Sequence, residues 1–261
     1  MSRCALITGA SGGIGYELAK LFAQEGCHTV LVARSEQRLA EVAQELRQSA
    51  GASVTVIPKD LAQPEAPDEL FAALQRQGLT VDVLVNNAGF GTHGPFAESD
   101  LSVQREMMQL NMVALTHLTR LLLPGMIKQR AGKILNMAST AAFQPGPLMA
   151  VYYASKAYVL SFSEALANEL RGTGVTVTVL CPGPTRTNFQ SRAGVGDSLL
   201  ARSGAADAAS VARAGYRGLM AGTAVVIPGA RNRLLAFSVR CFPRSLVVRA
   251  VRRIQEKRKP R

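Results

Sequence analysis

Three side chains in the middle of the sequence have the types and spacing needed to move a proton. Tyr152 and Lys156 are four residues apart, so on a helix they lie on one face, and Ser139 lies thirteen residues before Tyr152. Lowering a tyrosine pKa from about 10 to about 7 takes about 4 kcal/mol. A cation at about 4 Å supplies about that much at an effective dielectric of about 20. The pair predicts an acid–base site in which Lys156 lowers the pKa of Tyr152; Tyr153 is less suited, since Ala157 stands four residues after it.

A glycine-rich segment near the start of the chain is typical of a nucleotide-binding turn. It follows the apolar residues Ala5 to Thr8 and runs Gly9-Ala10-Ser11-Gly12-Gly13-Ile14-Gly15 into a helical pattern. Glycines there let the backbone turn tightly and approach a pyrophosphate, which lies at the positive end of the helix dipole. The segment predicts a dinucleotide site. A plain strand-to-helix turn is the alternative that this motif alone leaves open.

Short apolar runs alternate with helix-length segments along most of the chain. The expected strands are Ala5 to Thr8, Thr29 to Ala33, Val54 to Pro58, Val81 to Val85, Lys133 to Met137, Val175 to Leu180 and Ala224 to Ile227. The helical segments between them include Gly13 to Glu25, Glu36 to Gln48, Leu101 to Gln129 and Val151 to Arg171. This alternation predicts a single-domain α/β fold of the Rossmann type, with a doubly wound parallel sheet of about seven strands. Right-handed crossovers would place the motifs along one edge of that sheet.

From Arg3 to about Gly229 the chain resembles the classical short-chain dehydrogenase/reductases, of the NADP-preferring type. The motifs that carry the resemblance are Thr8-xxx-Gly12-Gly13-Ile14-Gly15, Asn86-Asn87-Ala88-Gly89, Tyr152-xxx-Lys156 and Pro182-Gly183, with Ser139 and Asn111 in the matching order. The resemblance implies that Tyr152 exchanges a proton with the substrate and that Lys156 also binds the nicotinamide ribose. It further implies that Ser139 binds the substrate oxygen and that Asn111 supports a water in a proton relay.

The same resemblance assigns the cofactor contacts and the assembly. The implied cofactor-binding residues are Thr8, Gly9, Ser11, Gly13, Ile14, Gly15, Arg34, Asp60, Asn87, Ala88, Gly89, Tyr152, Lys156, Pro182, Gly183 and Thr187. It also implies a small-molecule carbonyl or alcohol substrate and a homodimer or homotetramer. The segment from Ser191 to Ala206 reads as a mobile loop, which covers the substrate in the resembling family.

The residues at the end of the second expected strand favour NADP(H) over NAD(H). An acid at this place binds the ribose 2′-hydroxyl of NAD, and a cation accepts the 2′-phosphate of NADP. Here Ala33 stands in place of the acid and Arg34 follows it. The glycine turn has Ser11 and Gly12 where some NADP-dependent relatives carry a further basic residue. Asp60 is either part of the adenine site or the cap of a helix running from Gln63 to Leu70, and the sequence leaves both open.

Composition and cysteine usage indicate an intracellular, cytoplasmic protein. The 261 residues are 48% hydrophobic, and the four cysteines are isolated, so neither a disulfide framework nor a metal site is expected. His28, His93 and His117 are scattered without metal-ligand spacing. We expect no secretory signal at the N-terminus and no uninterrupted apolar run long enough to span a bilayer.

Most of the net positive charge lies in the last thirty-one residues. Residues 231–261, which we call the C-terminal tail, contain eleven basic residues and one acidic residue, giving +10 of the total +12. Residues 1–230, the expected catalytic domain, are nearly neutral, so we expect no nucleic-acid partner. Val247, Ala250, Val251 and Ile254 recur at helical spacing among basic residues. This amphipathic pattern fits either an anionic membrane surface or docking on the enzyme itself.

We therefore expect an NADP(H)-dependent oxidoreductase that interconverts a carbonyl and an alcohol by hydride transfer, with Tyr152 as proton donor or acceptor. The alternative from another class is a non-catalytic nucleotide-sensing or membrane-surface scaffold protein on the same fold. If the tail binds a membrane surface, a chain ending near Ala230 is expected to lose vesicle binding and keep its activity, because every catalytic and cofactor residue named above precedes the tail. If the tail docks on the enzyme, the shortened chain is expected to lose folding or dimerisation.

Overall fold

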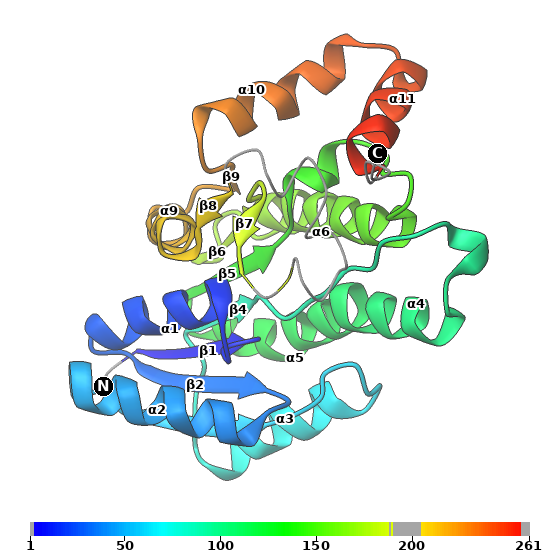
Figure 1. Cartoon of the computed structure of the whole chain (residues 1–261). Coiled ribbons are helices and arrows are strands. Elements are labelled where there is room, and N and C mark those ends of the chain that lie inside the picture. The colour runs from blue at the N-terminus through cyan, green and yellow to red at the C-terminus, as the bar shows by residue number, and fades with distance from the viewer. Residues whose placement is uncertain (1–2, 188, 190–204, 257–261) are drawn as a thin grey trace.

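A seven-stranded parallel sheet forms the centre of the molecule in a computed structural model, which describes residues 3–187, 189 and 205–256. The strands follow the order β3-β2-β1-β4-β5-β6-β9 (Figure 1). The chain thus winds outward in both directions from β1 and β4, and the carboxyl ends of these two strands lie at the point where the winding reverses. In such sheets, ligands bind at this point. The predicted doubly wound fold is confirmed.

The strands of the main sheet are β1 (Cys4–Thr8), β2 (His28–Ala33), β3 (Val54–Pro58), β4 (Val83–Asn86), β5 (Gly132–Met137), β6 (Val175–Leu180) and β9 (Val225–Val226). The helices are α1 (Gly13–Gln24), α2 (Glu36–Ala50), α3 (Ala66–Arg76), α4 (Leu101–Met108), α5 (Leu115–Lys128), α6 (Ala150–Glu169), α9 (Ala208–Met220), α10 (Ala230–Ser238) and α11 (Arg244–Gln255). Single turns of 3-10 helix occur at η1 (Phe96–Glu98), η3 (Thr140–Phe143) and η4 (Val239–Cys241), and η2 (Gln109–Ala114) is a π-helix. Two further short strands, β7 (Thr185–Arg186) and β8 (Ala206–Asp207), pair with each other.

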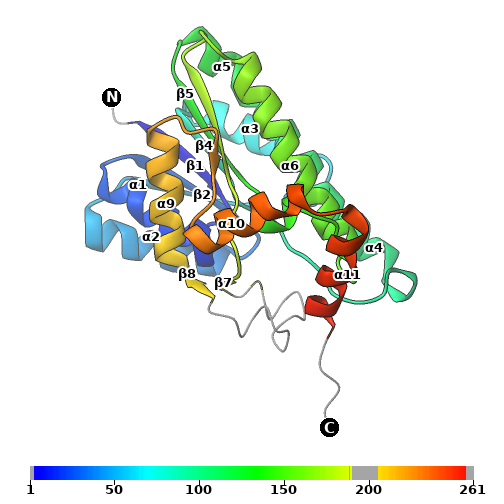
Figure 2. The same cartoon turned by 90° about the horizontal axis from the view of Figure 1, so that it is seen from above.

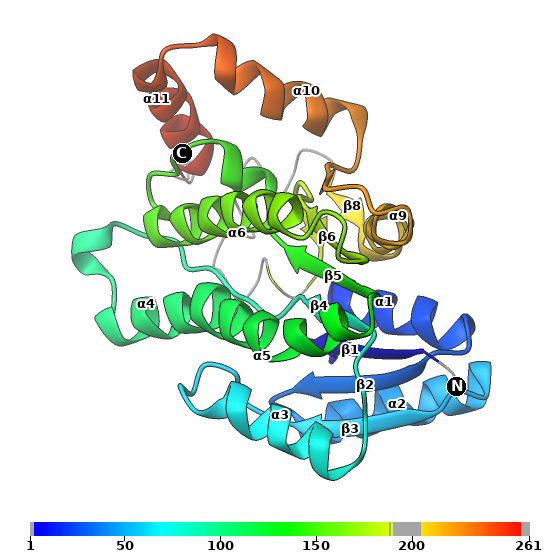
Figure 3. The ribbon, with the colours of Figure 1, turned by 180° about the vertical axis from the view of Figure 1, so that it is seen from behind.

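Helices cover both faces of the sheet because its strands carry apolar side chains on both sides. Helices α1, α2 and α9 pack on one face, where Ile7 and Leu31 point into the core. Helices α3, α5 and α6 pack on the other face over Leu6 and Val30, the face seen in Figure 3. Alternate residues of β1 and β2 therefore belong to opposite cores, as the period of two in a strand requires.

Helix α4, η2 and α5 form one continuous helix, Leu101–Lys128, that is long and apolar enough to cross a membrane by length and composition alone. The segment is not an uninterrupted apolar run, since Arg105, Glu106 and Arg120 lie within it. Within the fold the helix is part of the core layer: α5 contacts α3 and β5, and α4 contacts α6. Leu118 and Met126 are buried there, as expected of a core helix in an α/β domain.

The C-terminal tail leaves the body after β9 and then returns to it. Figure 2 shows α10 crossing away from the sheet edge and α11 turning back toward α6. Val251 on α11 is buried in the cluster that holds Tyr152 and Tyr153, and Val247 packs against this cluster. The contacts of α11 support the docking alternative for part of the predicted apolar stripe, while Ala250 and Ile254 stay exposed. Of the expected mobile loop, Ser191 to Gly204 lie outside the described residues, and Ala206 begins β8.

Candidate active site

The glycine turn lies pressed against the end of β4. Gly9 and Gly13 have φ angles of 66° and 56°, in the left-handed region that favours glycine. A Cβ on Gly9 would lie 2.7 Å from the Asn87 side-chain nitrogen, and one on Gly15 would lie 2.4 Å from the Gly9 carbonyl oxygen. On the other side, a Cβ on Gly13 would lie 3.0 Å from the Thr187 methyl group. The turn thus admits only glycine at these positions.

Thr8 and Asn87 tie the glycine turn to β4. The Thr8 hydroxyl donates to Val85 O at 3.2 Å and accepts from the backbone N–H groups of Asn87 and Ala88, each at 3.0 Å. The Asn87 amide in turn donates to Thr8 O at 2.9 Å and Gly9 O at 3.2 Å. Since Thr8 is 2% exposed, its hydroxyl contacts protein and supports the turn from below.

The beginning of α1 presents free backbone donors to an anion. Its N-cap is Gly12, which supplies no side-chain cap, and Ile14 follows within the first turn. Uncapped N–H groups and the positive end of a helix dipole together bind phosphate groups. The turn, its compressed glycines and this helix start fit a dinucleotide.

A cavity of about 470 Å³ lies beyond the end of β2. Its lining residues are Arg34, Asp60, Ala62, Gln63, Pro64, Arg105, Glu106 and Gln109. Arg34 is about half exposed and pairs with Glu106 at 3.6 Å. Exposed ion pairs contribute little to stability, so this pair can open toward a stronger anion.

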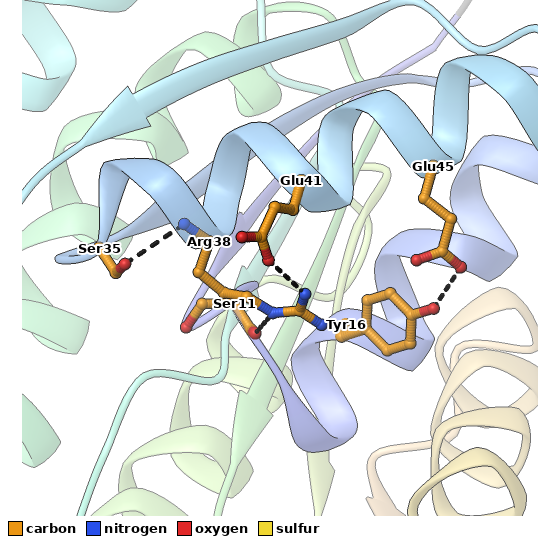
Figure 4. A network of polar contacts seen from close by, with 6 residues as sticks. All are labelled: Ser11, Tyr16, Ser35, Arg38, Glu41 and Glu45. Carbon is orange, nitrogen blue, oxygen red and sulfur yellow. Dashed lines mark hydrogen bonds and ion pairs between the residues drawn. The ribbon is translucent and has the colours of Figure 1, made fainter.

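A second cation lies beside the turn, and the sequence analysis did not identify it. Figure 4 shows Arg38 reaching from α2 to the glycine turn, where its Nε donates to Ser11 O at 3.2 Å. Its guanidinium also pairs with Glu41 at 2.7 Å. Ser35 caps α2 by accepting the Arg38 N–H, which fixes the start of the helix. The available signal was the position of Arg38 in the first turn of the helix that follows Arg34.

Asp60 does not cap the helix that follows it, because the N-cap of α3 is Glu65. Its carboxylate accepts the Ala62 N–H at 3.1 Å and so closes a local turn, and the residue also lines the cavity. The helix after it begins at Ala66, three residues later than expected. The expected start at Gln63 was wrong because residues 61–65 form turns before the helix.

Ser139, Tyr152 and Lys156 meet at the carboxyl end of the sheet. Ser139 follows β5 and caps η3, where its hydroxyl accepts the Ala141 N–H at 3.1 Å. Tyr152 and Lys156 lie in the first two turns of α6, and the Lys156 Nζ is 5.8 Å from the centre of the Tyr152 ring. Lys156 donates to Met137 O at 2.8 Å. The structure therefore brings together the three residues that the spacing singled out.

Burial controls the proton affinities of the two ionisable groups. Removal from water raises the pKa of Tyr152 well above its ordinary value, and a hydrogen bond with Ser139 acts in the opposite direction. Burial also lowers the pKa of Lys156 to about 8 from 10.5. In the protein alone, burial thus raises the pKa of Tyr152, whereas we expected Lys156 to lower it.

Asn111 is held inside a helical irregularity. It is part of η2, the π-helix, and is 1% exposed. Its amide donates to Phe90 O at 2.9 Å and to Ser155 Oγ at 3.1 Å, and its side-chain oxygen accepts the Phe90 N–H at 3.1 Å. Gly89 faces this amide, since a Cβ there would lie 2.9 Å from Asn111 Oδ1. The side chain thus links the end of β4 to α6, and π-turns of this kind are frequent at functional sites.

The turn after β6 closes the site opposite Tyr152. Pro182 O accepts the Thr140 N–H at 2.9 Å, and the Ser139 hydroxyl lies 3.4 Å from the same oxygen. A Cβ on Gly183 would lie 2.7 Å from the Asn232 amide of α10. Asn232 is thus a further residue at the site that the sequence analysis missed, and it shows that α10 also contacts the catalytic region.

The comparisons with known proteins agree with this geometry. The family model described as short chain dehydrogenase matches residues 3–196. The ketoacyl reductase HetN of Nostoc is 37% identical over 181 residues, which are 69% of this chain and 63% of the relative. The chain thus matches less than two thirds of that relative's length.

Two solved structures extend the likeness to nearly the whole chain. A short-chain dehydrogenase from Sphingobium yanoikuyae in complex with NADPH has a TM-score of 0.82 at 31% identity, with 94% of this chain and 95% of that chain covered. A short chain dehydrogenase/reductase from Burkholderia phymatum in complex with NAD has a TM-score of 0.80 at 30% identity, with 92% of each chain covered. Similar structures thus occur with either dinucleotide.

Proposed function

This chain belongs to the short-chain dehydrogenase family, and we propose that it reduces a carbonyl compound to an alcohol with NADPH, using Tyr152 as the proton donor. As an enzyme of this family it interconverts a carbonyl and an alcohol with NAD(P). The observation that carries the proposal is the meeting of Ser139, Tyr152 and Lys156 at one place, where a tyrosine hydroxyl that is protonated at neutral pH can donate to a bound carbonyl. A reduction needs a protonated donor, whereas an oxidation needs the tyrosinate.

The bound cofactor supplies the hydride. The chain's own residues bind the carbonyl and deliver the proton. Gly9, Gly13 and Gly15 would hold the pyrophosphate, and Pro182 and Gly183 would border the nicotinamide. Ser139 orients the carbonyl oxygen, and the hydroxyl proton of Tyr152 passes to that oxygen. Lys156, held by Met137 O, stabilises the negative charge left on Tyr152.

Support for a catalytic role comes from the complete set of polar groups at the site. A non-catalytic nucleotide sensor or scaffold would need no buried lysine beside a buried tyrosine, so this alternative is not favoured. Asn111 would hold a water behind Lys156 through its backbone, since its amide is already hydrogen-bonded to protein.

The test of Tyr152 is its replacement by phenylalanine. We expect Tyr152→Phe to lower kcat by about 10² to 10⁴ and to leave the Kd of NADPH nearly unchanged, because the hydroxyl is lost and the ring stays. Tyr158→Phe is the matched control, since Tyr158 lies on the same helix and is 40% exposed. A Tyr152→Phe protein that keeps more than about a tenth of wild-type kcat would exclude this residue as the donor.

We propose NADP(H) as the preferred cofactor and NAD(H) as the less favoured one. Arg34 lines the cavity and Arg38 lies beside Ser11, so two guanidinium groups are near the place where a 2′-phosphate would bind. Arg34→Asp should turn a preference for NADPH of about tenfold to a hundredfold into a preference for NADH. Arg217→Asp, on the exposed side of α9, is the control. Equal kcat/KM for both cofactors in the wild type would refute the role of Arg34.

The surroundings of Tyr152 support an apolar group next to the carbonyl. Its ring packs among Phe90, Met149 and Val251, and its centroid is 5.3 Å from that of Phe189. Together with the ketoacyl reductase among the relatives, this favours 3-oxoacyl thioesters as the substrate class. An NADPH oxidation assay with 3-oxoacyl thioesters, steroid ketones and short aldehydes tests this assignment; faster turnover of a short aldehyde would contradict it.

We propose a homodimer or homotetramer that assembles through α5 and α6, as enzymes of this family are commonly oligomeric. Val113, in η2 just before α5, is 48% exposed, and Tyr158 of α6 is 40% exposed and stacks on Phe162. Such an exposed apolar face fits a subunit interface. Val113→Glu should yield a monomer in light scattering. The wild type eluting as a monomer would rule the interface out.

A membrane-surface role for the C-terminal tail is a second proposal, and it places the enzyme in the cytoplasm at an anionic membrane. The supporting observation is a group of exposed apolar side chains among arginines, comprising Leu234, Leu235, Phe237, Phe242, Leu246 and Ile254. The four free cysteines agree with a reducing compartment.

Vesicle binding tests the membrane proposal. Vesicles of phosphatidylglycerol and phosphatidylcholine should bind the protein in a salt-sensitive way, and Phe237→Ser should weaken binding about tenfold. Phe96→Ser is the control, because Phe96 is 62% exposed and Phe237 63%. Equal losses in both variants, or no binding by the wild type, would contradict the proposal.

A further inference from the structure

The inner edge of α11 belongs to the apolar cluster that surrounds the active-site tyrosine. Val251 is 9% exposed and belongs to the same apolar cluster as Tyr152, Tyr153 and Met149. Val247, one turn earlier, packs on this cluster. The tail thus adds an apolar side chain to the cluster that contains the residue we propose as proton donor.

Gln255, at the end of α11, binds two separate segments of the active-site wall. It is 2% exposed, and its side-chain amide donates to the Tyr153 hydroxyl at 2.6 Å. Its backbone oxygen accepts from His93 Nε2 at 2.9 Å. A buried amide with a short hydrogen bond holds its partner in one position, since breaking the bond leaves polar groups buried without partners.

Both partners of Gln255 belong to segments that border Tyr152. The Tyr153 ring meets the Tyr152 ring edge-on, with centroids 6.0 Å apart, and a Cβ added to Gly146 would lie 2.2 Å from the Tyr153 ring. His93 lies two residues after Gly91, where an added Cβ would lie 2.9 Å from the Tyr152 ring. The loop that carries His93 is also tied to Leu148 O by the Gly94 N–H at 2.9 Å.

We propose that α11 is the outer wall of the substrate site, in which Val251 limits the size of the group beside the carbonyl and Gln255 is a positioning residue for Tyr153 and the His93 loop. This inference rests on the proposed carbonyl reduction and adds its specificity determinant. It also reverses the expectation that a chain ending near Ala230 keeps its activity, because that chain lacks the wall.

The experiment makes the side chain at position 251 smaller in one variant and larger in another. With NADPH, the ratio of kcat/KM for a long-chain to a short-chain 3-oxoacyl thioester should rise about tenfold in Val251→Ala and fall in Val251→Phe. Gln255→Ala should raise the ratio as well, through a higher KM for the short substrate. The Kd of NADPH should not change, and Arg253→Gln, exposed on the same helix, should match the wild type.

The outcomes separate this inference from the proposed function. If the wild type is active but Val251→Ala and Gln255→Ala have the same ratio as the wild type, α11 is not the wall of the substrate site. An equal loss of kcat for both substrates would also contradict the proposal, since a merely structural role would produce it. If Val251→Phe does not fold, these two alanine variants decide. A wild type that oxidises NADPH with neither thioester and with no ketone overturns the proposed function itself.

Discussion

Replacing Lys156 by methionine should make the protein more stable and inactive. Burial lowers the pKa of this lysine from 10.5 to about 8. At about pH 7 the lysine is charged in both states, and the folded state is disfavoured by about 3 kcal/mol, the free energy of that shift. Loss of the hydrogen bond to Met137 O removes about 1 kcal/mol. We therefore expect Lys156→Met to raise the free energy of unfolding by about 2 kcal/mol at neutral pH.

The sign of the pH dependence follows from the same shift. Since the folded pKa is lower than the unfolded one, the unfolded chain binds the extra proton between about pH 8 and about pH 10.5, and raising the pH through this range stabilises the wild type. Between about pH 7 and about pH 9.5, the free energy of unfolding of the wild type should therefore rise by about 2 kcal/mol relative to that of Lys156→Met. This corresponds to a relative rise of about 4 to 8 °C in Tm.

Thermal unfolding of both proteins at the two pH values measures this difference, and other titrating groups cancel between them. Lys128→Met, which changes an exposed lysine at the end of α5, is the matched control and should show no such gain. If the difference between wild type and Lys156→Met is the same at both pH values, or has the opposite sign, the burial of Lys156 does not carry the assigned free energy.

Three further substitutions test the supports of the site. Thr8→Val should lower the free energy of unfolding by about 2 kcal/mol, because it keeps the side-chain shape but leaves the Ala88 N–H without its acceptor. Urea unfolding measures this loss, and a change below about 0.5 kcal/mol would show that the N–H finds another partner. Gly15→Ala should abolish NADPH binding in calorimetry, since its Cβ would lie 2.4 Å from Gly9 O, and wild-type affinity would contradict the tight turn. Asn111→Ala should reduce Tm by about 6 to 12 °C, because it removes three buried hydrogen bonds worth about 1 kcal/mol each, and an unchanged Tm would show that these bonds do not stabilise the fold.

Local patterns predicted the sheet closely. The apolar runs at Val54 to Pro58 and Val175 to Leu180 coincide with β3 and β6, because a strand buried on both faces ends where its apolar side chains end. The segment Leu101 to Gln129 was predicted as one helix, and it is continuous to Lys128. The π-helix inside it was not predicted, since it depends on Asn111 bonding to Phe90 and Ser155 and not on apolar spacing.

Non-local contacts account for what the sequence did not reveal at the site. Gln255 is separated from Tyr153 by 102 residues and from His93 by 162, and no local pattern links them. The sequence predicted the apolar stripe of α11, but the spacing of its residues does not distinguish a stripe that faces lipid from one that faces protein. The rise in the Tyr152 pKa that burial causes in the protein alone was not predicted, because the sequence gives the distance along a helix and not the depth of burial.

The late position of α11 in the chain has a consequence for biosynthesis. A chain made from its N-terminus has β1 to β9 and the glycine turn before Gln255 exists, and domains begin to fold as they emerge. The last contact to form then joins residues 162 apart, which is a slow, non-local closure. A nascent chain, or a chain that proteolysis has shortened, can therefore bind its nucleotide while the substrate pocket is still open to water. Binding to a nucleotide resin thus does not show that the substrate pocket is complete. Proteolysis between α10 and α11 would convert the mature protein to the same form, which binds nucleotide but lacks α11.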